Sequence, residues 1–143
     1  FTQIPETCLA RLSRPVPRIK AGIAIRNIAS AAIDISDGLI SDLQHILDSS
    51  SVGAEIELAR IPVCPESNDL LDEIKWKICL GTGDDYELCF TMPDTYADAV
   101  TEIEKKSECS VTRIGTIVEG NKLKWFSVDG KPCTLSHSGY RHF

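Results

Sequence analysis

The chain has 143 residues, of which 43% are hydrophobic and 25% are charged, the balance of one soluble globular domain. This composition excludes collagen-like and disordered chains, and no run approaches the roughly 18 apolar residues that a membrane-spanning helix needs. The N-terminus also lacks the basic, apolar and small-residue order of a signal peptide. We therefore expect a cytoplasmic protein with no membrane partner.

The formal net charge is −6, and it is unevenly distributed. Residues 1–28 hold five basic residues against one acidic residue, a charge of +4, so the remainder carries −10. This acidic body argues against a nucleic-acid partner, since nucleic-acid binding needs a basic surface. The basic stretch could serve a phosphate or an acidic partner surface, or it could be a solvated face.

The six cysteines show no CxxC pair, and they accompany no secretory signal. We expect reduced thiols, several of them filling the core, and the spacing does not favour zinc. They are Cys8, Cys64, Cys79, Cys89, Cys109 and Cys133.

Residues 1–17 contain three prolines and little periodicity, which predicts an extended linker emerging from a missing N-terminal domain. The domain itself is expected over 18–143. Apolar residues at helical spacing predict a helix within 18–28, and a short apolar run predicts a strand over 31–35.

An amphipathic stripe predicts the clearest helix, which begins at about Asp37. The stripe consists of Leu39, Ile40, Leu43, Ile46 and Leu47. Alternation over 54–61 predicts a strand, and Ser67 or Asn68 could cap a helix that stops at Gly81.

The second half continues with a strand over 86–92 and a helix from about Asp94 towards Lys106. Two strands, 111–118 and 122–128, are expected to form a hairpin around residues 119–121, and Asp129-Gly130 is a second hairpin signal. These elements predict an α+β fold with helices packed on a mixed β-sheet.

The first candidate site lies where the strand over 31–35 meets the helix. Alternate side chains of a strand share a face, so Asp34 and Ser36 point one way, and Asp37 follows where the helix begins. Hard oxygen ligands suit magnesium, which takes one or two protein carboxylates and completes its shell with water and phosphates. A helix N-terminus also favours phosphate.

A simpler interpretation is that Ser36 or Asp37 caps the helix. Capping does not account for Asp34, a carboxylate in an otherwise apolar strand. An EF-hand is excluded, because its required glycine and glutamate positions hold Leu39 and His45.

The second candidate is residues 81–88 (GTGDDYEL), in which two glycines permit a tight turn before three acidic residues. This segment is not a GxGxxG fingerprint, because Tyr86 takes the third glycine's place and the order is helix to strand. Consecutive acids are usually solvated, so both interpretations stay open. In the tail, His137 and His142 are five residues apart, a spacing that suits no common metal pattern.

Three segments together resemble the C-terminal half of the bacterial thiamine-monophosphate kinase family, and residues 139–143 (GYRHF) resemble its C-terminus. The segments are 14–19 (RPVPRI), 30–43 (SAAIDISDGLISDL) and 83–91 (GDDYELCFT). The resemblance implies a fold like the C-terminal domain of the aminoimidazole-ribonucleotide synthetase relatives, of PurM C-terminal type and partly ferredoxin-like.

The same resemblance implies transfer of a phosphoryl group from ATP onto thiamine monophosphate, with Mg²⁺, to give thiamine diphosphate. It implies magnesium ligation by Asp34 and Asp37, an ATP contact at Ser36 and a substrate contact at Asp84. His137 stands where the family commonly has a tryptophan that stacks on the substrate, and imidazole offers a smaller stacking area. Thr82 replaces a glycine of the usual loop.

The resemblance further implies partners: a missing N-terminal domain, without which the chain is expected to be inactive, and a second copy in a homodimer of the full-length form. Two alternatives remain. One is another ATP-dependent enzyme of the same superfamily, and the other is a noncatalytic ligand-binding module.

Overall fold

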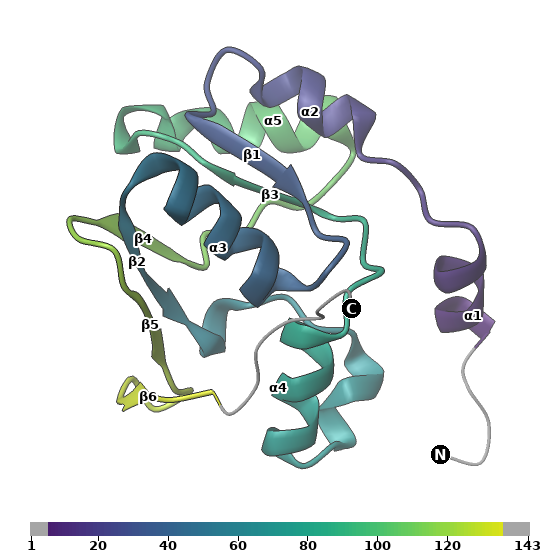
Figure 1. Cartoon of the computed structure of the whole chain (residues 1–143). Helices are drawn as coiled ribbons and strands as arrows, with labels where there is room; N and C mark the ends of the chain where they lie inside the picture. Colours follow the sequence, from purple (N-terminus) through teal and green to yellow (C-terminus); the bar gives the residue numbers. More distant parts are fainter. Residues whose placement is uncertain (1–5, 136–143) are drawn as a thin grey trace.

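The computed structural model describes residues 6–135, which form two sheets with helices packed around them, while the first helix, at residues 6–13, lies to one side (Figure 1). A two-stranded antiparallel sheet pairs β1 (Ala31–Asp34) with β3 (Leu88–Thr91). A four-stranded sheet has the order β4-β2-β5-β6. Its strands are β2 (Gly53–Glu57), β4 (Gly115–Val118), β5 (Leu123–Phe126) and β6 (Pro132–Cys133).

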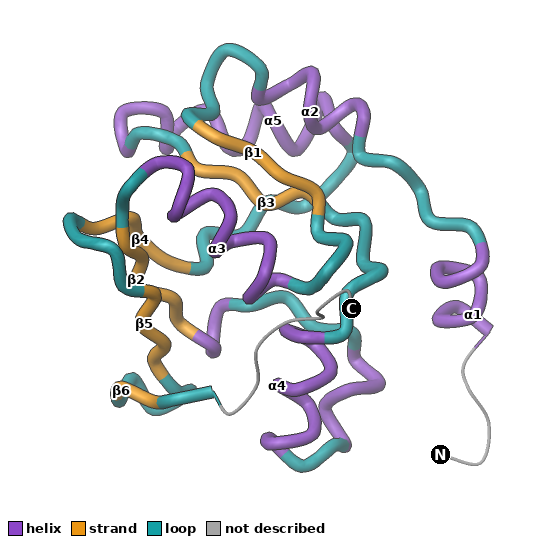
Figure 2. The backbone as a smooth tube through the Cα atoms, in the orientation of Figure 1, coloured by secondary structure: helices purple, strands orange, loops and turns teal. Residues whose placement is uncertain are grey.

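Five α-helices and three short 3-10 helices lie in the described part of the chain (Figure 2). The α-helices are α1 (Glu6–Ser13), α2 (Ile19–Ile25), α3 (Leu39–Ser50), α4 (Asp72–Gly81) and α5 (Val100–Ser107). The 3-10 helices are η1 (Leu58–Arg60), η2 (Pro65–Asp69) and η3 (Asp94–Ala99). The expected α+β class is confirmed, and β2 and β5 run parallel, so the larger sheet is mixed.

The apolar stripe of α3 forms the centre of the core. Leu39, Leu43, Ile46 and Leu47 are all buried, as the periodicity predicts. They join buried residues from both sheets and from α4 in one cluster, which includes Ala54, Ile56, Leu80, Cys89 and Trp125. This packing fixes the start of α3 against the end of α4, and the candidate loops lie at that junction.

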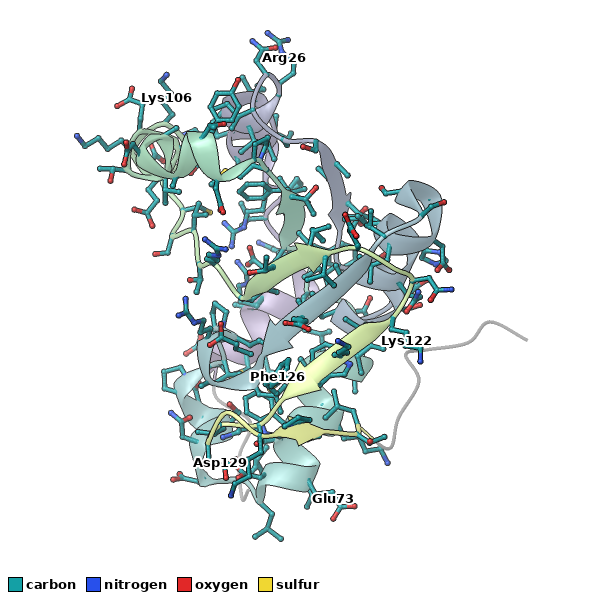
Figure 3. The ribbon with its side chains drawn as sticks, turned by 90° about the vertical axis from the view of Figure 1, so that its left-hand side faces the viewer. Arg26, Glu73, Lys106, Lys122, Phe126 and Asp129 are labelled. Carbon is teal, nitrogen blue, oxygen red and sulfur yellow. The ribbon has the colours of Figure 1, made fainter. Side chains whose placement is uncertain are left out.

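The predicted hairpin between 111–118 and 122–128 is wrong, because β2 lies between β4 and β5. β4 pairs antiparallel with β2, and β5 pairs parallel with it on the other side. Figure 3 looks onto this sheet, with Lys122 labelled just before β5 and Phe126 at its last residue. The expected second hairpin is confirmed, since β5 pairs antiparallel with β6 around Asp129-Gly130.

Gly53 allows the connection from β4 to β5 to cross over β2. A Cβ at this position would lie 2.7 Å from the carbonyl oxygen of Lys122, and the N–H of Ala54 donates to that oxygen at 3.0 Å. The connection therefore passes directly over the first residue of β2, where a side chain would block it.

Two further local expectations are wrong. Residues 6–13 form α1 instead of an extended segment, with Glu6 in its first turn and Arg11 in its last, an arrangement that complements the helix dipole. Neither Ser67 nor Asn68 caps α4, which begins at Asp72 after Leu71 and has no side-chain cap. Ser67 instead donates its hydroxyl to the carbonyl of Cys64.

All six cysteines are free thiols, as expected. Cys89 is buried in the core and Cys133 packs against it, whereas Cys64 is exposed. Within residues 6–135, no helix is both long enough and apolar enough to cross a bilayer.

Candidate functional site

The first candidate loop connects β1 to α3. Ile33 and Ile35 pack against the core while Asp34 is exposed, which is the alternation that the sequence predicts. Ser36 and Asp37 are half-buried in the bend that follows. The helix begins at Leu39, two residues later than expected.

The capping interpretation of Ser36 and Asp37 does not describe this loop. The N-cap position is Gly38, with φ of +101°, and no side chain caps the helix there. A Cβ at Gly38 would lie 2.9 Å from the carbonyl oxygen of Leu80, so the end of α4 passes directly against this residue. Glycine is required here by both the backbone angle and the close approach.

The second candidate loop runs alongside the first and is joined to it by backbone hydrogen bonds. The N–H of Ile35 donates to the carbonyl of Glu87 at 2.8 Å, and the N–H of Tyr86 donates to the carbonyl of Ile35 at 2.8 Å. The N–H of Asp84 donates to the carbonyl of Ser36 at 3.0 Å. The two segments singled out from the sequence thus form one structure.

Gly83 allows the closest contact between the loops. Its φ is +73°, and a Cβ there would lie 2.2 Å from the carbonyl oxygen of Ser36. Asp84 and Tyr86 also adopt left-handed backbone angles, with φ of +61° and +51°. Such angles are uncommon outside glycine and occur at functional sites, where the surrounding structure enforces them.

Tyr86 is a member of this site for which the sequence predicts no role. Its hydroxyl donates to Oδ1 of Asp84 at 3.1 Å. This hydrogen bond and the Asp84 charge raise the pKa of Tyr86, and the charges of Asp34 and Asp37 add to the rise. Carboxylates from both loops therefore raise the pKa of the same hydroxyl group. The motif places Tyr86 between acids, but only the structure shows that its hydroxyl points to Asp84.

Glu87 closes the second loop with an ion pair to the basic N-terminal stretch. Arg18 donates to both carboxylate oxygens, at 2.8 and 2.6 Å, and Arg11 of α1 donates to one of them at 2.5 Å. The hydrogen bond from Arg18 is the main reason that the pKa of Glu87 is lowered. The sequence left a phosphate, an acidic partner surface or a solvated face open for the basic stretch. For Arg11 and Arg18 the structure shows an ion pair within the chain instead.

Asp85 has the opposite environment. Neighbouring protein atoms desolvate its carboxyl and raise its pKa to about 6, although the residue as a whole is exposed. The nearby Glu87 charge adds to the rise, and Arg11 opposes it. The pKa values of Asp85 and Glu87, two acids of the same loop, are thus shifted in opposite directions.

The donor set of the first loop fits magnesium as a partial site. Asp34 and Asp37 supply hard carboxylate oxygens, and one or two such ligands are the usual protein share for this cation. Among the described residues, no group of three or more ligating side chains is arranged to hold a metal. A cation here would therefore complete its shell with water, phosphates or further protein groups.

One candidate, His137, lies outside the described residues, so its expected substrate contact stays a prediction.

Asp42 is the second residue, after Tyr86, that makes a side-chain contact to a candidate loop and for which the sequence predicts no role. It is 2% exposed, and its side chain accepts hydrogen bonds from the first loop. The sequence signal that points to Asp42 is the presence of a carboxylate on the apolar side of a predicted amphipathic helix.

Comparison with known proteins identifies the family to which the chain belongs. The family model described as AIR synthase related protein, C-terminal domain, matches residues 10–126. The thiamine-monophosphate kinase of Buchnera aphidicola subsp. Schizaphis graminum is 44% identical over 133 residues, which cover 91% of this chain and 41% of that protein. The chain thus spans about two fifths of the length of this relative.

Two solved structures are similar. The crystal structure of thiamine-monophosphate kinase from Stenotrophomonas maltophilia K279a has a TM-score of 0.78 at 36% identity, covering 90% of this chain and 40% of that one. AaThiL complexed with AMPPCP and TMP has a TM-score of 0.70 at 27% identity, covering 100% and 44%. The expected fold is confirmed, and the chain belongs to the AIR synthase related family, whose C-terminal domain it matches.

Proposed function

We propose that the chain is the C-terminal domain of a kinase that uses ATP to phosphorylate thiamine monophosphate, which yields thiamine diphosphate. The relatives named above are thiamine-monophosphate kinases, and AaThiL has been solved with AMPPCP and TMP together. The observation that carries the proposal is the backbone pairing of the two loops, Asp84 to Ser36 and Tyr86 to Ile35, which combines the candidate nucleotide and substrate residues in one site.

Each side chain has a distinct role in this proposal. Asp34 and Asp37 would hold Mg²⁺, and Ser36 would contact ATP. Asp84, held by Tyr86, would orient thiamine monophosphate, and His137 would stack on its ring. Magnesium, when bound, would supply neutralisation of the negative charge on the transferring phosphates.

The reaction needs little covalent help from the protein. A phosphate oxygen of thiamine monophosphate attacks the γ-phosphorus of ATP in line. A bond forms between that oxygen and phosphorus, the bond to the β,γ-bridging oxygen breaks, and ADP leaves with the electron pair. The chain's contribution is to hold the two phosphates in line and to keep the acceptor oriented.

We further propose that catalysis requires an N-terminal domain and that the complete protein is a homodimer. The requirement for a further domain is supported by the match to about two fifths of each relative and by described carboxylates that form only a partial cation site. The homodimer is what the family resemblance implies. On this proposal, carboxylates of the other domain complete the cation site. The isolated chain would then bind ligands weakly and turn over no substrate.

The test is product formation from thiamine monophosphate, ATP and Mg²⁺ by the complete gene product that contains this chain, alongside the 143-residue chain. We expect thiamine diphosphate from the complete gene product only. Asp37→Asn should lower its formation at least about tenfold at limiting Mg²⁺. Asp48→Asn, an exposed carboxylate change on the same α3 helix, should leave it unchanged.

Absence of thiamine diphosphate from the complete gene product would contradict the proposal. A panel of purine-precursor substrates would then separate another ATP-dependent enzyme of the superfamily from a noncatalytic module. Turnover by the isolated chain would contradict the requirement for a further domain but leave the assigned reaction intact.

A further inference from the structure

Asp42 is a buried carboxylate in a helix face that is otherwise apolar. Its residue exposure is 2%, and the other buried residues of α3 are Leu39, Leu43, Ile46 and Leu47. Burying a carboxylate is costly unless hydrogen bonds replace the lost water. An apolar side chain would fill this position at lower cost, so the hydrogen bonds that Asp42 makes indicate its purpose.

Those hydrogen bonds go to the candidate loop. Oδ2 of Asp42 accepts the backbone N–H of Ser36 at 3.0 Å and the backbone N–H of Asp37 at 3.0 Å. The backbone N–H of Asp42 itself donates to the carbonyl of Gly38 at 3.0 Å. One oxygen thus holds two consecutive amides of the loop, while the backbone of Asp42 is fixed in the helix.

This arrangement differs from ordinary helix capping. A capping side chain accepts the N–H groups of the first helical turn, whereas Asp42 accepts N–H groups of two residues that precede the helix. It therefore acts on the loop and adds little to the hydrogen bonding of the helix. Its place in the first turn of α3 is favourable for a negative charge.

Ser36 is held from two sides as a result. Its N–H donates to Asp42, and its carbonyl accepts the N–H of Asp84 from the second loop. The backbone at Ser36 thereby links the buried carboxylate to the segment that carries Asp84. Any shift of Ser36 would move both candidate loops.

We propose that Asp42 is a positioning residue: its buried carboxylate, through one oxygen bound to the amides of Ser36 and Asp37, sets the shape of the loop that meets the cation and the nucleotide. Asp42 touches neither ligand. The part of this inference that concerns ligands rests on the proposed kinase function. The part that concerns loop shape does not, and the two are tested separately.

The first measurement is amide hydrogen exchange at Ser36 and Asp37 in the ligand-free 143-residue chain. In Asp42→Asn the amide oxygen carries no charge and is a weaker acceptor for two N–H groups. We expect exchange at these two amides to rise at least about tenfold, with the amides of Ile46 and Leu47 unchanged. Asp48→Asn on the same helix is the matched control and should change none of them.

Unchanged exchange at Ser36 and Asp37 would overturn the proposal. An equal rise at Ile46 and Leu47 would also overturn it, because Asp42 would then be stabilising the fold and not the loop. Should Asp42→Asn fail to fold, Asp42→Glu keeps the charge but displaces the carboxylate by one methylene. It should raise exchange at the same two amides, and an unchanged value would overturn the proposal.

The second measurement is steady-state kinetics of the complete gene product. Asp42→Asn should raise KM for magnesium-ATP at least about tenfold, with a smaller change in KM for thiamine monophosphate. Wild-type KM values in the variant would overturn the ligand part of the inference. Failure of the kinase proposal would appear differently, as absence of product from the wild type, while the exchange result would still decide the positioning role.

Discussion

At the scale of single residues, the site depends on two glycines, because the lack of a side chain at each lets two backbone segments approach closely. Gly38 and Gly83 each lie against the backbone of another segment, and both have positive φ angles that favour glycine. The two contacts bring the end of α4 and the acidic loop against the loop that carries Ser36 and Asp37. A single methyl group at either position would separate these segments.

The change Gly83→Ala tests this fit. The positive φ alone costs about 1–2 kcal/mol for an L-residue, and the new Cβ would lie 2.2 Å from the Ser36 oxygen. We expect a larger loss of unfolding free energy than in Gly130→Ala, where φ is +77° and nothing lies within 4 Å. Chemical denaturation measures both, and equal losses would show that the loops do not meet as described.

Thiol reactivity tests the burial of Cys89. Desolvation, with a smaller contribution from the Asp42 charge, raises the pKa of this thiol from 9.0 to about 11. Since the thiolate is the reactive form, its fraction at neutral pH falls about a hundredfold relative to an ordinary thiol. Brief alkylation followed by peptide mass spectrometry should find label on exposed Cys64 and little on Cys89. Similar labelling of both would contradict the described core.

At the scale of elements, helix patterns could be predicted better than strand pairing. The stripe of α3 and the stop at Gly81 follow from the sequence, because helix contacts are local in the chain. The turn signal at residues 119–121 correctly marks a reversal, but it carries no information on which strands pair. The insertion of β2 depends on a close approach at Gly53 that only the fold reveals.

The helix α1 illustrates a related limit. Three flanking prolines suggest an extended segment, yet residues 6–13 between them form a helix whose Arg11 reaches Glu87. The partner is 76 positions away in sequence, so local spacing could not indicate it. For the candidate site, the sequence indicates both loops, but it does not indicate Asp42 or Tyr86. The contacts of each depend on the position of one oxygen atom, Oδ2 of Asp42 or the hydroxyl of Tyr86, which only the fold determines.

A core substitution tests the central place of α3. Leu47 is 1% exposed, and Leu47→Ala should lower the unfolding free energy by about 2–5 kcal/mol. His45→Ala, an exposed change on the same helix, should stay within about 0.5 kcal/mol of the wild type. Urea denaturation measures both, and a loss under 1 kcal/mol for Leu47→Ala would place the core elsewhere.

The ion pair of Glu87 gives the junction of α1, α2 and the acidic loop a pH dependence. Because the pKa of Glu87 is lowered from 4.5 in the folded chain, its stabilising effect is present above that value. The effect is lost as the pH falls through the lowered folded pKa. Glu87→Gln should therefore have a lower Tm than the wild type at pH 7, and the difference should shrink below about pH 4.

The control for this comparison is Glu119→Gln, an exposed carboxylate in the connection before β5. It should have a Tm close to that of the wild type at both pH values. A gap between Glu87→Gln and the wild type that stays constant from pH 7 to pH 3 would show that the ion pair contributes no stability.

At the scale of the whole molecule, the fold brings together two loops that are about fifty positions apart in the printed sequence. β1 and β3 pair antiparallel, so the end of one strand lies beside the start of the other. The segments after Asp34 and before Leu88 therefore meet at the same end of this two-stranded sheet. The core around α3 holds this end in place, and the chemistry that we propose would occur there.

The measurement that tests this account most directly is the kinetic separation of Asp37→Asn and Asp84→Asn in the complete gene product. Asparagine tolerates the left-handed backbone at Asp84, so each change removes mainly a charge. Asp37→Asn should raise the Mg²⁺ and magnesium-ATP requirement, and Asp84→Asn should raise KM for thiamine monophosphate at least about tenfold. If neither variant changed its own parameter, the two loops would not form the site that we describe.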